Sequence, residues 1–166
     1  RRVGKSSLAK QTILTSKGVR PVFIDFMGIK TTDALIKRIL RAIVLAEKKR
    51  SLGASILKKF ASVRPTLSID PVTSMPTVSF DASVDMTADS IGESINLIQA
   101  LYEGKKVAIV MDECQDILDL KDSHEALAIF RSNIQHQPQI PYVFIGSIRH
   151  KMAGIFMDNK SPFFKS

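Results

Sequence analysis

Cysteine is nearly absent from this chain of 166 residues: Cys114 is the only one, so no disulfide can form within the chain. The three histidines, His124, His136 and His150, do not have the spacing of metal ligands. No apolar run approaches the roughly 20 residues that a membrane-spanning helix needs, and the segment beginning at Arg1 lacks the apolar core of a signal peptide. These absences argue against a disulfide scaffold and a Cys/His metal site, and they predict a soluble, cytoplasmic protein that does not bind membranes.

The overall composition is that of an ordinary globular domain. Hydrophobic residues make up 45% of the chain and charged residues 24%, which argues against a disordered or fibrous protein. The length predicts one domain over residues 1–166. Residues 1–64 contain 16 lysines and arginines but three acids, a net charge of +13, whereas residues 65–166 contain 8 and 13, a net charge of −5. We therefore expect an anionic partner for the first part: a nucleotide phosphate, a nucleic acid or an acidic protein.

Segments with the apolar spacing of helices alternate with short apolar runs, which is the pattern of a layered α/β fold. Residues 35–44 are the clearest helix, because their apolar positions recur every three or four residues. The threonines and the aspartate at 31–33 supply cap residues for it. We expect helices over residues 4–16, 31–49, 54–61 and 90–104 and after Asp122, and buried strands over residues 21–26, 107–111 and 142–145.

Two local patterns predict where elements begin or turn back. Ser90 and Glu93 match a capping box, so we expect a helix to open at Ser90. Apolar residues alternate with polar ones over residues 78–84, which indicates a half-buried strand, and residues 66–69 form a weaker partner across two prolines. A β-hairpin insert is therefore expected at about residues 66–84.

Gly4, Lys5, Ser6 and Ser7 match the second half of the phosphate-binding loop, G-x-x-x-x-G-K-[ST]. Glycine lets the backbone turn tightly beside a phosphate, and N–H groups at the start of the following helix point at the anion. Lys5 can place a positive charge near the β- and γ-phosphates, and the Ser6 hydroxyl can ligate Mg²⁺. The first glycine of the pattern would lie two residues before Arg1. Four residues alone also fit an ordinary helix start.

A second motif agrees with the first. Residues 107–111 are continuously apolar and lead into two adjacent carboxylates, Asp112 and Glu113. An acid at the carboxyl edge of a parallel strand faces the crevice where open α/β sheets bind ligands. Asp112 could hold Mg²⁺, directly or through water, and Glu113 could orient and polarise the water that attacks a γ-phosphate. The competing interpretation, a solvated loop start, is disfavoured by the order of the two motifs along the chain.

Several runs resemble one known group of proteins. Residues 1–8, R-R-V-G-K-S-S-L, resemble the R-R-x-G-K-[ST]-[ST]-L loop of AAA+ ATPases of the archaeal ATPase family, which is related to the STAND ATPases and the origin-recognition initiators. Residues 111–117, M-D-E-C-Q-D-I, are similar to the family's [F/L]-D-E-[F/A]-Q-[E/D]-[I/L] run. Residues 141–147 resemble its next strand, and the likeness continues in residues 148–152 and 161–164.

The resemblance implies a three-layer α/β/α P-loop NTPase of the ASCE/AAA+ type with a parallel sheet ordered 5-1-4-3-2. By the same comparison the chain starts within the Walker A loop, so that the first strand is missing, and the lid and any C-terminal domain are absent. The implied cofactors are ATP and Mg²⁺. The implied roles are nucleotide binding for Gly4, Lys5, Ser6 and Ser7, Mg²⁺ binding for Ser6 and Asp112, acid/base catalysis for Glu113 and γ-phosphate sensing for Ser147.

Other residues allow two interpretations. Arg149 follows the sensor strand and could reach a phosphate in its own subunit or in a neighbour of a nucleotide-dependent homo-oligomer, but it also fits a plain surface position. Basic residues between 37 and 64 are the candidate surface for DNA or a protein partner, and binding there would be salt-dependent. A solvated helix face is the alternative. Asn159-Lys160 resembles a guanine-reading motif, but Pro162 stands where that motif needs aspartate, which argues against GTP.

The function expected from these observations is Mg²⁺-dependent hydrolysis of ATP to ADP and phosphate by an AAA+/STAND-type ATPase domain that drives a conformational change. The alternative is a nucleotide-switched DNA- or protein-binding module with little turnover. A third interpretation is a degenerate fold that binds no nucleotide. Cys114 is expected to be a small apolar filler, and the histidines are expected to be surface or capping residues.

Overall fold

A computed structural model describes residues 4–46, 66–72, 76–79, 86–102 and 104–164. Its main sheet has three parallel strands, β1 (Arg20–Asp25), β4 (Val107–Asp112) and β5 (Tyr142–Phe144), in the order β1-β4-β5. This is the order that the sequence resemblance implied for these three strands. Asp25 pairs with Asp112 in the register of β1 and β4, so the two strands end side by side.

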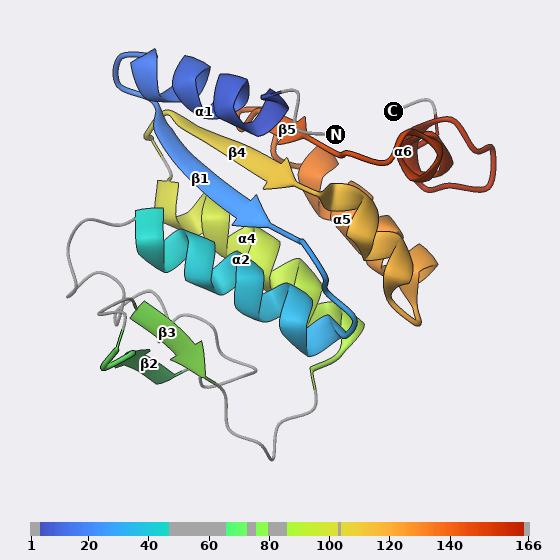
Figure 1. The fold of residues 1–166 in the computed structure, drawn as a ribbon, viewed down its shortest axis with the longest axis horizontal. Helices are drawn as coiled ribbons and strands as arrows, with labels where there is room; N and C mark the ends of the chain where they lie inside the picture. The colour runs from blue at the N-terminus through green and yellow to red at the C-terminus, as the bar shows by residue number, and fades with distance from the viewer. Residues whose placement is uncertain (1–3, 47–65, 73–75, 80–85, 103, 165–166) are drawn as a thin grey trace.

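Helices lie on both sides of this sheet (Figure 1). On one side α1 (Lys5–Thr15) lies against β1 and β4. On the other side α2 (Thr32–Ala46) packs against β1 and against α4 (Ala88–Tyr102), which in turn contacts α5 (Ser123–Gln135). A 3₁₀ helix, η1 (Cys114–Asp119), follows β4, and α6 (Arg149–Phe156) follows β5. The layered α/β fold predicted from the sequence is therefore confirmed.

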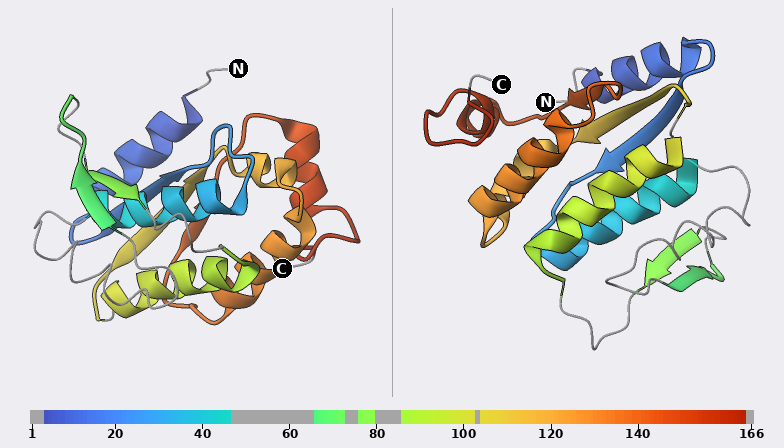
Figure 2. Two further views of the ribbon diagram at one scale, coloured as in Figure 1. Left: turned by 90° about the horizontal axis from the view of Figure 1, so that it is seen from below. Right: turned by 180° about the vertical axis from the view of Figure 1, so that it is seen from behind.

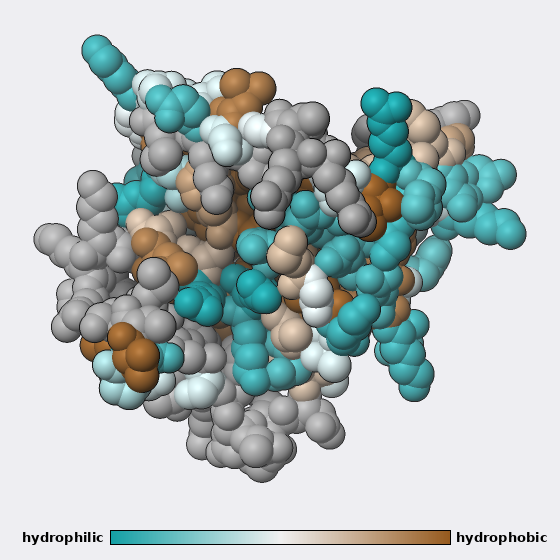
Figure 3. Space-filling model, viewed as in Figure 1, coloured by the Kyte–Doolittle hydropathy of each residue, from teal (hydrophilic) through white to brown (hydrophobic). Residues whose placement is uncertain are grey.

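The core lies between the sheet and the α2–α4 layer. Apolar side chains of α2, α4 and β4 are fully buried there, among them Ile36, Ile39, Ile43, Ile95 and Ile109. Residues 107–111 are all buried, as their apolar run predicts for a strand covered on both faces. Hydrophilic side chains gather at the right of Figure 3, where Figure 1 places α5, and the apolar residues of that helix face inward. Among the described residues, no helix combines the length and the apolar character needed to cross a bilayer.

The expected hairpin is present where the structure describes it. β2 (Thr66–Ile69) and β3 (Pro76–Ser79) are antiparallel, with Leu67 opposite Val78. The rest of the predicted strand, residues 80–84, lies outside the described residues. The predicted helix over residues 54–61 and the end of the helix expected over 31–49 also lie outside them.

Two expectations from the sequence are wrong. Ser90 does not open a helix, because α4 begins at Ala88 and Ser90 is buried within its first turn. The strand over residues 142–145 is not fully buried: Val143 is 36% exposed, and Tyr142 and Phe144 are half-buried. The reason is its position, since β5 is an edge strand of the sheet that the described residues form.

Candidate functional site

The two sequence motifs, Gly4–Ser7 and Asp112–Glu113, lie near the carboxyl edge of the sheet. β4 ends there at Asp112, and the turn after β5 brings Ser147 to the same edge. Figures 1 and 2 show that α1 begins at this edge, so that the Gly4–Lys5–Ser6 segment and the Asp112–Glu113 pair lie at one end of the sheet. Gly4 precedes α1 with a φ of +72°, a left-handed conformation that glycine adopts without steric cost. The positions of the Lys5 and Ser6 side chains lie outside what the structure describes.

The turn from β4 into η1 places the acidic pair. Glu113 has a φ of 51° and a ψ of 37°, a left-handed conformation that costs a residue with a side chain about 1–2 kcal/mol. Its N–H donates to Asp112 Oδ1 at 3.1 Å. Both residues are half-buried. This sharp turn stops the strand at Asp112 and lets two consecutive carboxylates stay at the sheet edge.

Ser147 and Glu113 are in direct contact. The Ser147 hydroxyl donates to Glu113 Oε2 at 2.7 Å. The structure therefore brings together the residues predicted as the phosphate sensor and the catalytic acid/base, although 33 residues lie between them in the sequence. Gly146, just before Ser147, packs so closely against Gln115 and Met152 that a Cβ atom would collide with both.

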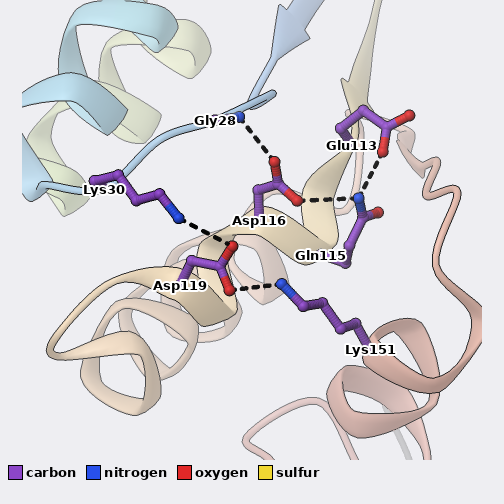
Figure 4. A network of polar contacts seen from close by, with 7 residues as sticks. All are labelled: Gly28, Lys30, Glu113, Gln115, Asp116, Asp119 and Lys151. Atoms are coloured by element: carbon purple, nitrogen blue, oxygen red, sulfur yellow. Dashed lines mark hydrogen bonds and ion pairs between the residues drawn. The ribbon is translucent and has the colours of Figure 1, made fainter.

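Gln115 is a site residue to which the sequence assigned no role. Its side chain is 1% exposed, and its amide nitrogen donates to Glu113 Oε2 at 2.5 Å and to Asp116 Oδ1 at 3.1 Å (Figure 4). Its carbonyl oxygen accepts a hydrogen bond from the Ser147 N–H at 3.3 Å. In the sequence, the only pointer to this residue was that residues 111–117 resemble the family's run, which has a glutamine at this position. The contacts of Gln115 could not be predicted, because they depend on how the chain folds.

Two further carboxylates of η1 extend the network shown in Figure 4. Asp116 Oδ2 accepts the Gly28 N–H at 2.8 Å, which ties η1 to the loop after β1. Asp119 lies 2.6 Å from Lys151 Nζ and 3.6 Å from Lys30 Nζ. The hydrogen bond from Lys151, with smaller contributions from the charges of Lys151 and Lys30, holds the pKa of Asp119 below its ordinary value of 3.8. The 3₁₀ helix η1, which follows the acidic pair, is thus bonded both to the loop after β1 and to α6.

The remaining predicted residues lie around this site or apart from it. Ser7 is exposed in the first turn of α1. Arg149 begins α6, is exposed, and lines a pocket with Gly146, Met152 and Phe156. Cys114 is buried beside Met152, as expected of a small apolar filler, and burial raises the pKa of its thiol to about 12.

The histidines have the surface and capping positions expected of them. His124, His136 and His150 are all exposed. His136 caps the end of α5, and His124 Nε2 lies 3.1 Å from the Lys160 carbonyl oxygen.

The candidate partner surface at residues 37–64 is described only as far as residue 46. Lys37 there pairs with Asp33 at 2.9 Å, and Arg38 donates to the Met27 carbonyl at 3.3 Å. These two cations therefore already have partners within the chain.

Comparisons with known proteins support the fold and little beyond it. No protein-family model matches the chain, and no curated protein matches its sequence. The structure is similar to that of a Walker-type ATPase of Pyrococcus abyssi, with a TM-score of 0.58 and 21% sequence identity. The match covers 99% of this chain and 44% of that protein, so the chain spans less than half the length of the ATPase. Over nearly its whole length, the chain has the fold of a Walker-type P-loop ATPase.

Proposed function

We propose that this chain binds ATP together with Mg²⁺ and hydrolyses the ATP to ADP and phosphate. One observation supports the proposal: α1 begins at the carboxyl edge of the parallel sheet at which β4 ends in Asp112, and Glu113 there accepts a hydrogen bond from Ser147. Open α/β sheets bind their ligands at that edge. The similarity of the fold to a Walker-type ATPase supports the same function.

The start of α1 suits a triphosphate. The first N–H groups of a helix have no partner within it, and α1 begins at the sheet edge, where such groups can donate to phosphate oxygens. The first turn contains no acid that would repel an anion. Lys5 would add a positive charge beside the β- and γ-phosphates.

The donor set also suits magnesium. The Asp112 carboxylate and the Ser6 hydroxyl are oxygen ligands of the kind that Mg²⁺ prefers. No three His, Cys, Asp or Glu side chains within the described part of the chain are grouped as an all-protein metal site. Mg²⁺ bound with a nucleotide does not need one, because one or two protein oxygens, water and phosphates complete its shell. When bound there, the ion would neutralise phosphate charge during the reaction.

Glu113 is the residue proposed to act on the attacking water. Its Oε2 accepts hydrogen bonds from Ser147 and Gln115, which fix the plane of the carboxylate. Figure 4 shows the other oxygen directed away from Gln115. A carboxylate held in this way can orient a water molecule and accept its proton, a contribution of about 10²–10⁴ in rate for a general base.

Two substitutions in the full chain separate binding from hydrolysis. Glu113→Gln removes the base but keeps the shape, so the dissociation constant for ATP–Mg²⁺ should stay within about threefold while kcat falls about 10²–10⁴-fold. Lys5→Ala should abolish binding in calorimetry, whereas Lys17→Ala, an exposed lysine beyond the end of α1, should not. Parent-like turnover by Glu113→Gln, or parent-like affinity in Lys5→Ala, contradicts the assignment.

A nucleotide-switched binding module is the second candidate, because the net charge of +13 over residues 1–64 suits an anionic macromolecule. Steady-state ATPase assays with and without duplex DNA distinguish the two. A slow parent rate together with ATP-dependent, salt-sensitive DNA binding would favour the switch. Turnover that DNA does not change would favour the ATPase acting on another partner.

A further inference from the structure

The side chain of Gln115 is the point where three segments of the site meet. It is 1% exposed, and its amide hydrogen-bonds to Glu113, to Asp116 and to the backbone of Ser147. Only the NH₂ end of an amide can face two carboxylates, so the neighbours fix which end is nitrogen. The carbonyl end then faces the Ser147 N–H, a donor that suits it. A buried amide whose two ends both match their neighbours has one orientation.

The consequence for Glu113 is a fixed carboxylate. Its Oε2 accepts from Gln115 Nε2 at 2.5 Å and from Ser147 Oγ at 2.7 Å. Two donors on one oxygen restrict rotation of the carboxylate more than either would alone. The backbone supports this arrangement, because the residue before Ser147 is glycine and a side chain there would collide with the Gln115 carbonyl oxygen. The space at Gly146 is therefore matched to the glutamine.

The same amide couples Glu113 to the loop after β1. Gln115 Nε2 donates to one oxygen of Asp116, and the other oxygen of Asp116 accepts the Gly28 N–H at 2.8 Å. Figure 4 shows these contacts as a continuous path from Glu113 to Gly28. The side chain of Gln115 therefore links three segments, directly or through Asp116. They are the end of β4, the turn after β5 and the loop after β1.

We propose that Gln115 is a positioning residue for the hydrolysis step: it holds the Glu113 carboxylate against Ser147 in the orientation that activates water. This inference rests on the proposed ATPase function. It assigns Gln115 an effect on the chemical step and none on nucleotide affinity, since the hydrogen bonds of its side chain within the described part of the chain are to Glu113, Asp116 and Ser147.

The test is Gln115→Met in the full chain, which keeps the length of the side chain and removes its hydrogen bonds. We expect the calorimetric dissociation constant for ATP–Mg²⁺ to stay within about twofold and kcat to fall about 10–100-fold, the scale of a small misplacement of a catalytic group. Gln115→Glu should lower kcat at least as much, because it places a third carboxylate beside Glu113 and Asp116.

The matched control is Gln137→Met. Gln137 is equally buried and bonds to Tyr142 and Asn96, but it lies near the start of β5, at the other end of the sheet. Both variants should lower the melting temperature, and only Gln115→Met should lower kcat. A double-mutant cycle gives a second readout. In a Glu113→Gln background, Gln115→Met should change the single-turnover rate less than twofold, because the group through which it acts is already gone.

Each outcome decides the matter. A Gln115→Met variant with parent kcat overturns the inference, as does a loss of kcat matched by an equal loss of ATP affinity. Additive effects of Glu113→Gln and Gln115→Met overturn it as well. A parent chain that does not turn over ATP overturns the proposed function, and the positioning role falls with it, whereas an active parent with a silent Gln115→Met removes the positioning role alone.

Discussion

At position 146 any side chain larger than a hydrogen atom requires the side chains of Met152 and Gln115 to move. A methyl group there would overlap Met152 Sδ and Gln115 Oε1. The backbone of Gly146 is not left-handed, so space and not conformation requires glycine here. This close approach lets the turn after β5 run directly over Gln115, where the Ser147 N–H meets the amide oxygen.

Gly146→Ala should therefore lower the free energy of unfolding by about 1–3 kcal/mol, the usual cost of overfilling a packed site. Urea unfolding followed by circular dichroism measures the change. Gly154→Ala is the control, because the nearest atom to its Cβ would be Leu118 Cδ1 at 3.8 Å, an ordinary contact. Alanine inside α6 should be neutral or stabilising by up to about 1 kcal/mol. If both variants lost the same free energy of unfolding, the lack of space for a side chain at position 146 would not be the cause of the loss.

Among the single residues of the site, the sequence predicted Asp112, Glu113 and Ser147. It did not predict Gln115, which hydrogen-bonds to two of them. Asp112 and Glu113 follow a buried apolar run, and that position is visible in the sequence. The role of Gln115 depends on Ser147, which is 32 residues away and reaches it only through the pairing of β4 with β5. No local pattern contains that contact.

At the scale of elements, the start of α2 shows what local chemistry can specify. Thr31 precedes the helix, and its hydroxyl oxygen accepts the Ala34 N–H at 3.1 Å, as the cap residues at 31–33 predict. The comparable prediction for Ser90 is wrong, because the same Ser-x-x-Glu spacing also fits inside the first turn of α4. The sequence pattern does not distinguish the two positions, whereas burial of Ser90 in the core does.

Thr31→Ala should cost about 0.5–2 kcal/mol of unfolding free energy, since it leaves the Ala34 N–H without its side-chain acceptor. Thermal or urea unfolding measures the loss. Thr32→Ala, at the first residue of α2, removes a hydroxyl that does not make this cap and should cost less. If the two alanine variants were equally stable, the hydrogen bond from Ala34 would have no value as a cap.

The strand order is also an element-scale result. The resemblance implied that the three strands lie in the observed order, and the parallel pairing of β4 with β1 on one side and with β5 on the other confirms it. The burial of β5 was predicted wrongly, because an apolar run such as residues 142–145 does not reveal whether its strand lies inside a sheet or at an edge.

At the scale of the whole molecule, Asp119 links segments that are far apart in sequence. It lies between Lys30, after β1, and Lys151, on α6. Its pKa is lowered in the folded chain, so the ionised form stabilises the fold. That contribution is complete above the ordinary pKa of 3.8 and is lost as the pH falls through the lowered value.

Lys151→Met should therefore reduce stability at neutral pH, and the difference from the parent should shrink as the pH falls below about 4. Urea unfolding at a series of pH values between 7 and 2 tests this. Lys160→Met removes an equal charge from an exposed position and should show no such dependence. A Lys151→Met deficit that stays constant down to pH 2 would show that the ion pair does not contribute.

The left-handed backbone of Glu113 has a consequence for any directed evolution of this chain. Glycine or asparagine would relieve the torsional cost at that position but would discard the carboxylate. Libraries screened only for heat resistance should therefore become enriched in replacements at position 113 and lose turnover as they gain robustness. Libraries screened for turnover should retain the glutamate and improve their robustness elsewhere.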